Sequence, residues 1–212
     1  MFNRQMFLRL SLATSVLVAA ACADPGVSQV GPTGIALGAG GLAVVGGEGP
    51  ESANVMNQGG GGVYAPDGAT LVRQPNGFRA SVTVPTPESG TYNYPAGRVP
   101  GHPEVFTLWA FVFNYPNLCT APCNMDDLGN TPAKGGVYNV GGHVASGASL
   151  TISGQIAVGE TPFGGWPLES PATAEVHLAI APHGYVAPEN RATEFNLPTG
   201  PMAFWWVAVF VP

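Results

Sequence analysis

Charged side chains are scarce in this sequence. Its 212 residues include seven basic and thirteen acidic ones, 9% of the chain, against roughly 25% in typical soluble proteins. No basic run occurs after Arg9, and nucleic-acid binding needs clustered Lys and Arg to neutralise phosphates. The sequence therefore excludes nucleic acid as a partner. Loss of residues 1–21 would remove Arg4, Arg9 and no acid, which would make the mature chain more acidic still.

The motifs of common catalytic sites are missing too. The chain has no G-x-S-x-G elbow, no H-E-x-x-H zinc motif and no P-loop lysine. Residues 38–43 fit a loose G-x-G-x-x-A pattern, but dinucleotide binding needs that pattern between a strand and a helix. No motif therefore predicts an enzyme.

Long helices are not expected, because glycine (30 residues) and proline (21) are abundant. Each interior Gly costs a helix about 1 kcal/mol and each Pro about 3 kcal/mol. Apolar residues still make up 45% of the chain, so a packed core is expected. This composition predicts short strands joined by turns.

The N-terminus predicts export. Residues 1–9 carry two positive charges and no negative one, and an apolar run covers residues 10–21. That run is shorter than the roughly 20 residues of a membrane-spanning helix. We therefore predict a signal peptide over residues 1–21; a buried N-terminal helix is the alternative.

The end of this segment, Ala19-Ala20-Ala21-Cys22, resembles the lipobox of bacterial lipoproteins, although Ala19 stands where Leu is usual. The resemblance implies that Cys22 becomes the lipidated first residue, and more than one acyl chain gives stable anchoring. Ala23 stands where an Asp would favour the inner membrane, which implies the outer membrane in a host that has one. Cleavage without acylation, which would release a secreted chain, remains open.

Two further cysteines, Cys119 and Cys123, lie four apart in the segment CTAPC. An oxidising compartment would let them form a disulfide. The alternative is a metal site, but two thiolates without a second Cys pair or a nearby His make a poor zinc site. We predict the disulfide.

The remaining chain divides into a predicted Gly-rich linker over residues 22–62 and a domain over residues 63–212. Alternating apolar residues at 35–37 and 42–44 leave open that part of the linker joins the sheet. In the domain, residues 78–84, 150–158 and 176–180 alternate apolar and polar side chains, which is typical of half-buried strands. Val158 is expected on the core face of its strand.

Residues 105–113 and 202–211 are apolar on both faces, which is typical of covered central strands. We predict an all-β fold, an antiparallel β-sandwich of about seven or eight strands. The proline-rich stretch 85–104 or a partner surface is expected to cover the second apolar face.

Histidine and carboxylate positions suggest a site. Strand parity places Glu175 and His177 on the face away from the core, and it places His143 outside the core as well. His183 would join them if its strand continued so far. Imidazole and carboxylate suit Zn²⁺ or Cu²⁺, so a divalent metal site is one hypothesis; ordinary surface hydrogen bonds are the alternative.

The segment 124–130, NMDDLGN, clusters oxygen ligands. Asp126 and Asp127 could bind Ca²⁺, but their spacing is not that of an EF-hand loop. Asp and Asn are also common in turns, where they bond to nearby backbone. The turn is the favoured interpretation.

Three segments resemble an uncharacterised family of secreted bacterial β-sandwich proteins: residues 106–116 (FTLWAFVFNYP), the Cys pair with its acidic turn, and residues 174–184 (AEVHLAIAPHG). In that family a T-L-W strand leads to F-N-x-P, a Cys pair and an A-E-(V/I)-H-L…H-G segment. The resemblance brings no known activity. It implies one common design that includes Cys119, Cys123, Glu175, His177 and His183.

The sequence therefore predicts a non-enzymatic cell-envelope lipoprotein, anchored to a membrane and binding an envelope protein or a surface polymer. A Cu²⁺- or Zn²⁺-binding domain is the first alternative. A hydrolase that uses a Glu–His pair is the second, and it would need those side chains to converge in a cleft.

Overall fold

The computed structural model describes residues 49–57, 62–94, 97–120, 122–129, 131–195 and 205–212. The predicted signal peptide, Cys22 and residues 23–48 of the predicted linker lie outside the described residues. Among the helices within those ranges, none combines the length and the apolar character needed to cross a membrane.

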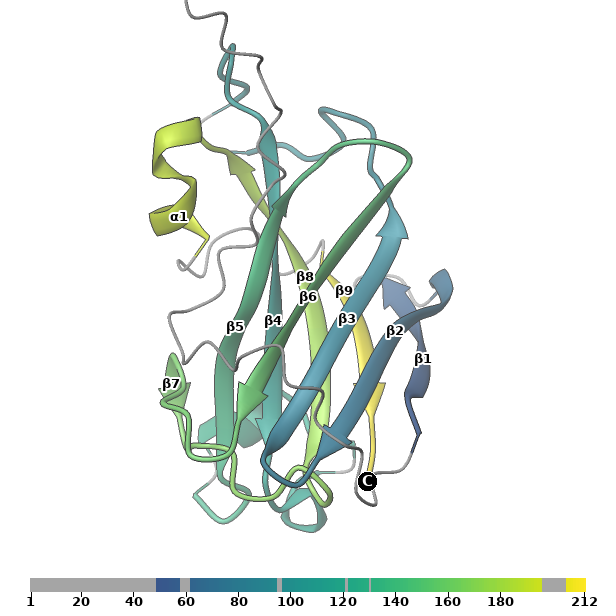
Figure 1. The fold of residues 1–212 in the computed structure, drawn as a ribbon, viewed down its shortest axis with the longest axis vertical. Coiled ribbons are helices and arrows are strands. Elements are labelled where there is room, and N and C mark those ends of the chain that lie inside the picture. Colours follow the sequence, from purple (N-terminus) through teal and green to yellow (C-terminus); the bar gives the residue numbers. More distant parts are fainter. Residues whose placement is uncertain (1–48, 58–61, 95–96, 121, 130, 196–204) are drawn as a thin grey trace, which may run out of the picture.

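The described chain folds into one antiparallel sheet (Figure 1). Its nine strands are β1 (Glu51–Asn57), β2 (Val63–Gln74), β3 (Gly77–Pro85), β4 (Glu104–Phe113), β5 (Gly135–Val144), β6 (Ser149–Ala157), β7 (Gly164–Gly165), β8 (Glu175–Tyr185) and β9 (Trp206–Phe210). The described helices are short: η1 (Pro116–Leu118), η2 (Met125–Gly129), η3 (Pro188–Asn190) and α1 (Arg191–Glu194). The order across the sheet is β6-β3-β2-β1-β9-β8-β4-β5-β7. The all-β antiparallel prediction is confirmed.

The sheet curls into a half-barrel, and the predicted sandwich of seven or eight strands is replaced by one continuous sheet. The reason is β1, which pairs with β2 on one side and with β9 on the other. It joins the two layers that a sandwich would keep separate. β1 lies within residues 22–62, so the linker prediction is wrong for residues 51–57, and the alternative that part of this stretch joins the sheet holds there.

The curl brings β6 in front of β5 and β4 (Figure 1). At the closest approach, a Cβ on Gly154 of β6 would overlap the carbonyl oxygen of Val140 in β5. Only glycine lets the two backbones come so near. The predicted strands 78–84, 150–158 and 176–180 correspond to β3, β6 and β8.

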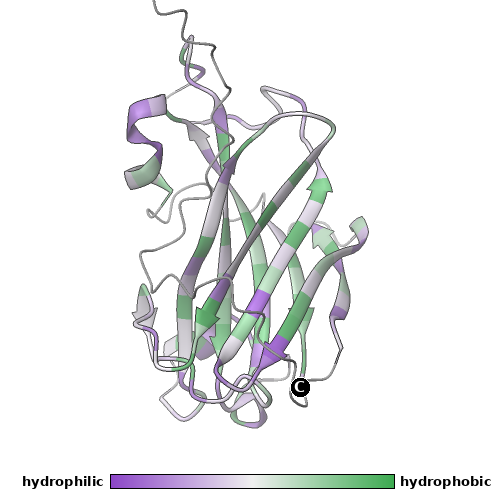
Figure 2. Ribbon diagram, viewed as in Figure 1, coloured by the Kyte–Doolittle hydropathy of each residue, from purple (hydrophilic) through white to green (hydrophobic). Residues whose placement is uncertain are grey.

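The core fills the inside of the curl. Leu108 and Ile180 from one layer and Val82 and Ile152 from the other belong to one buried cluster. Figure 2 shows the underlying alternation as apolar and polar bands along the strands. Val158 does not join the core, because β6 ends at Ala157; its exposed fraction is 41%.

The outer face of β4 and β8 carries a second apolar cluster. Trp109, Phe111 and Phe113 of β4 pack there with Ala179 and Ala181 of β8. Segments that follow the strands cover them: this cluster also contains Cys123 and Trp205. The second apolar face predicted for residues 105–113 is therefore real.

The predicted cover of that face, residues 85–104, lies elsewhere. Tyr92 packs on Phe106 and Trp206 of the inner core, with ring centroids 6.1 and 5.8 Å apart. Tyr94 donates a hydrogen bond from its hydroxyl to Glu104 Oε1 at 2.6 Å. Burial and this hydrogen bond raise the pKa of Tyr94. The proline-rich stretch therefore packs against the inner core.

Candidate functional site

The candidate site lies on the outer face where β4 ends and β8 begins. Phe113 pairs with Glu175 and Phe111 pairs with His177 across the two strands. Residues two apart on a strand share a face, so Glu175 and His177 lie side by side, as strand parity predicts.

Glu175 and His177 form a hydrogen-bonded pair. His177 Nε2 lies 2.6 Å from Glu175 Oε1, and the side chains are only 13% and 6% exposed, respectively. The backbone N–H of Cys123 donates to the same carboxylate oxygen at 2.9 Å. The His177 ring packs 5.3 Å from Phe113. Two donors thus hold the buried carboxylate, and the carboxylate in turn orients the imidazole.

The loop that supplies Cys123 is closed by the predicted disulfide. Cys119 and Cys123 are bonded, with Cα atoms 5.1 Å apart. Buried Asp127 accepts backbone N–H bonds from Thr120 at 3.3 Å and Asn124 at 2.9 Å. Its carboxylate therefore stabilises the loop, which agrees with the turn interpretation of this segment. The backbone N–H of Asp126 also bonds within this turn, since it donates to Asn124 Oδ1 at 2.8 Å.

Asn114, the residue after β4, anchors the start of the loop. Its Nδ2 donates to the carbonyl oxygens of Lys134 and Pro167, both at 2.9 Å, and its Oδ1 accepts the N–H of Glu169 at 2.8 Å. On the surface nearby, Lys134 and Tyr115 both donate to the Glu169 carboxylate. The hydrogen bond from Lys134 is the main cause that lowers the pKa of Glu169.

A pocket of about 220 Å³ opens between this loop and the sheet. Ala179, the small residue two positions after His177 on β8, lies between larger neighbours and leaves room there. Most of the lining is apolar, and three of its side chains are large aromatic ones. The lining residues are Phe111, Phe113, Cys123, Asn124, Met125, His177, Ala179, Trp205 and Val207.

Trp205 contributes an unsatisfied donor. Its side chain is 6% exposed and packs 6.1 Å from the ring of Phe111. Its Nε1 is buried, and no acceptor for it occurs within the described part of the chain. A buried donor without an acceptor costs about 1–3 kcal/mol.

His143 lies on the other side of the sheet from the pair. A β-bulge in the β4–β5 pairing, between Leu108 and Trp109, inserts Val140 as an extra residue. The extra residue reverses the alternation, so His143 pairs with Phe106 of the inner core. The predicted outward orientation of His143 is therefore wrong.

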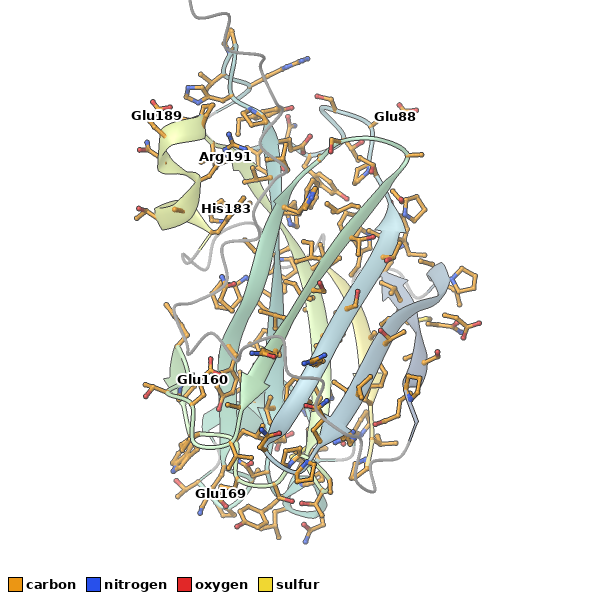
Figure 3. The ribbon with its side chains drawn as sticks, viewed as in Figure 1. Glu88, Glu160, Glu169, His183, Glu189 and Arg191 are labelled. Carbon is orange, nitrogen blue, oxygen red and sulfur yellow. A yellow bond between two sulfur atoms is a disulfide. The ribbon has the colours of Figure 1, made fainter. Side chains whose placement is uncertain are left out.

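His183 is buried but distant from the pair. It lies six residues beyond His177 on β8, about 20 Å at roughly 3.3 Å per residue. Figure 3 shows it at the end of the sheet where α1 lies. Among the residues that the structure describes, no three His, Cys, Asp or Glu side chains are grouped so that they could hold a metal ion. The structure brings together Glu175 and His177 and does not assemble the predicted four-residue metal site.

Three features of the site were missed by sequence reasoning: the pocket, Trp205 and the Cys123 N–H donor. The small outward-facing residues of β8, Ala179 and Ala181, were the available signal for a hollow. Comparisons with protein-family models, curated proteins and solved structures gave no match to the chain.

Proposed function

We propose that the protein is a non-enzymatic, lipid-anchored protein of the bacterial cell envelope that binds a ligand in the pocket beside Glu175 and His177. The N-terminal pattern supports export and anchoring through Cys22. The observation that carries the binding function is a mostly apolar pocket bordered by the imidazole of His177, which Glu175 holds in a fixed orientation.

The composition of the pocket favours recognition. Binding sites for small molecules are usually concave and apolar, with a few convergent polar groups that fix orientation. This pocket follows that pattern, with His177 and Asn124 as its polar members. Its volume of about 220 Å³ is below the roughly 300–1,000 Å³ of drug-sized sites. It is therefore suited to one ring or one short branched chain.

Hydrolysis by the Glu175–His177 pair is the second candidate, because the two side chains touch and border a pocket. A covalent mechanism needs a nucleophile within hydrogen-bond reach of the base. The nine lining residues include no hydroxyl, and Cys123 is held in the disulfide. The lining offers hydrogen bonds and apolar contact, so we place binding ahead of hydrolysis.

A fragment screen with two matched variants tests the proposal. Small neutral and charged aromatic compounds are titrated into the purified protein and detected by ligand-observed NMR. Ala179→Leu fills the pocket, whereas Val158→Leu enlarges an exposed residue after β6, outside the lining. We expect Ala179→Leu to weaken binding at least about tenfold and Val158→Leu to leave it unchanged. Equal binding by both variants, or no binding at millimolar concentration, would refute the pocket's role.

A further inference from the structure

The imidazole of His177 has one nitrogen engaged and one open. Nε2 lies 2.6 Å from Glu175 Oε1, whereas Nδ1 makes no hydrogen bond with any residue that the structure describes. The described polar atoms that are both unpartnered and sealed from solvent belong to Glu104, Tyr185 and Trp205. His177 Nδ1 is not one of them, so it is open. Because the ring lines the pocket and its side chain is 13% exposed, a bound ligand can reach this nitrogen.

The engaged nitrogen fixes the chemical role of the open one. Glu175 Oε1 accepts the backbone N–H of Cys123 at 2.9 Å, so it acts as an acceptor toward His177 as well, and the ring proton lies on Nε2. In a neutral imidazole the nitrogen without the proton is a hydrogen-bond acceptor. His177 Nδ1 therefore offers a lone pair, and the ligand group that matches it is a hydrogen-bond donor.

Asn124 supplies the complementary group. Its Oδ1 already accepts the backbone N–H of Asp126 at 2.8 Å, so its side chain offers a ligand only the amide N–H donors. The polar side chains of the lining thus present one acceptor, on His177, and one kind of donor, on Asn124. A hydroxyl group both donates and accepts hydrogen bonds. It matches these two side chains better than a group that only donates or only accepts.

Charge at the site argues against an ionic ligand. The described lining contains no Lys, Arg, Asp or Glu. The nearby carboxylate of Glu175 has a side chain only 6% exposed, and it is already engaged by two donors. A buried charge without a partner is costly, so an uncharged ligand fits best.

We infer that the pocket binds an uncharged aromatic group that carries a hydroxyl, and that this hydroxyl donates a hydrogen bond to His177 Nδ1. This inference rests on the proposed binding function and adds the chemical class of the ligand. The ring packs against Phe111 and Phe113 in the space beside Ala179, because aromatic rings pack well in offset or edge-to-face arrangements. Glu175 is a positioning residue, since it holds the imidazole with Nδ1 as the acceptor.

Four related probes test the ligand class: p-cresol, p-xylene, benzoate and benzylamine. A methyl group in p-xylene replaces the hydroxyl of p-cresol, and the other two probes carry opposite charges. Affinities are measured from the Ala179 methyl resonance, in the wild type and in His177→Phe, which keeps a ring and removes the acceptor. We expect the wild type to prefer p-cresol over p-xylene about fivefold and the variant to bind both within about twofold. We also expect benzoate and benzylamine to bind the wild type at least about tenfold more weakly than p-cresol.

A second measurement, made on the wild type alone, guards against distortion of the variant. The nitrogen NMR signal of His177 Nδ1 should move upfield when p-cresol binds and should stay in place with p-xylene. A preference for p-cresol that survives in His177→Phe, or an Nδ1 that is unmoved or protonated with p-cresol bound, would overturn the hydroxyl assignment while the pocket stands. Tight binding of benzoate or benzylamine would overturn the neutral class. Failure of all four probes to bind would remove the pocket function itself.

Discussion

Half-buried Tyr94 and buried Glu104 form a hydrogen-bonded pair at the end of the sheet opposite the pocket. Glu104 is 5% exposed, and its Oε1 accepts from the Tyr94 hydroxyl at 2.6 Å, while its Oε2 is buried without a partner in the described chain. The hydroxyl is thus the only donor found for this carboxyl group among the described residues. Removal of the Tyr94 hydroxyl should therefore lower the stability of the fold.

We predict that Tyr94→Phe lowers the free energy of unfolding by about 2 kcal/mol, because a hydrogen bond to a charged group contributes about 1.5–3 kcal/mol. Urea denaturation measures the change. Tyr115→Phe is the matched control, since the Tyr115 hydroxyl donates to Glu169 at the same distance of 2.6 Å on the surface. The control should show no measurable change, and equal losses in both variants would contradict the burial argument.

Buried and half-buried tyrosines also predict a loss of stability in alkali. Burial is the main cause that raises the pKa of Tyr138 to about 12, and it raises the pKa of Tyr92 and Tyr94 further. In the unfolded chain a tyrosine releases its proton near pH 10. The unfolded state therefore binds fewer protons above that pH, and stability falls as pH rises from about 10 to 12. These groups add no pH dependence below about pH 10.

Urea midpoints measured between about pH 8 and pH 11.5 check this prediction. The urea midpoint of Tyr138→Phe should fall less steeply above about pH 10 than that of the wild type, because the variant lacks one of the hydroxyls whose pKa is raised. A midpoint that stays constant across the range would show that these hydroxyls titrate as in the unfolded chain.

Among the elements, the disulfide loop contributes both to the stability of the fold and to the geometry of the site. Cys123 lines the pocket, donates its N–H to Glu175, and is tied to Cys119. We predict that the double variant Cys119→Ser/Cys123→Ser lowers the free energy of unfolding by about 2 kcal/mol, the chain-entropy value for so short a loop. Ligand binding should weaken as well, because the wall and the donor are no longer held in place.

Urea denaturation and the ligand titration measure both effects, and wild-type protein kept in reductant should reproduce them. Unchanged affinity in the reduced protein would mean that the loop holds its position without the covalent bond.

At the level of elements, sequence periodicity predicted β3 and β6 with their buried faces, because their side chains follow the two-residue repeat. It predicted β8 as a half-buried strand, which is wrong, because the outer cluster buries the second face of β8 as well. It could not place His143, because one extra residue in β5 reverses the repeat and leaves no mark in the composition. It also missed β1, whose residues 51–57 lack a clear apolar alternation and are half-buried or exposed at most positions. Pairing with two neighbouring strands, together with the burial of Val55 in the core, holds β1 in the sheet.

The same limit applies to the candidate site. Parity placed Glu175 and His177 together because both lie on one strand. The pocket depends on residues from β4, the disulfide loop, β8 and the start of β9, and their meeting is set by the order of strands across the sheet. That order follows from long-range pairing, which local patterns do not report.

For the whole molecule, the proposed anchor is testable apart from the pocket. We predict that the full chain, expressed in a bacterium with an outer membrane, is cleaved before Cys22 and carries acyl chains on it. Cys22→Ser should abolish incorporation of labelled fatty acid and should release the protein from the membrane fraction. Mass spectrometry of the N-terminal peptide distinguishes acylation from simple cleavage. Recovery of the uncleaved chain from the cytosol would contradict export.

The most direct test of the binding pocket locates a bound ring in the molecule. Nuclear Overhauser effects are measured between an aromatic compound that binds in the fragment screen and the alanine methyl groups of the purified protein. We predict cross-peaks from the ring protons to the methyl group of Ala179, on the outer face, and none to that of Ala208, which belongs to the inner core on the neighbouring strand. Cross-peaks from the bound ring to other alanines but not to Ala179 would contradict the proposed site.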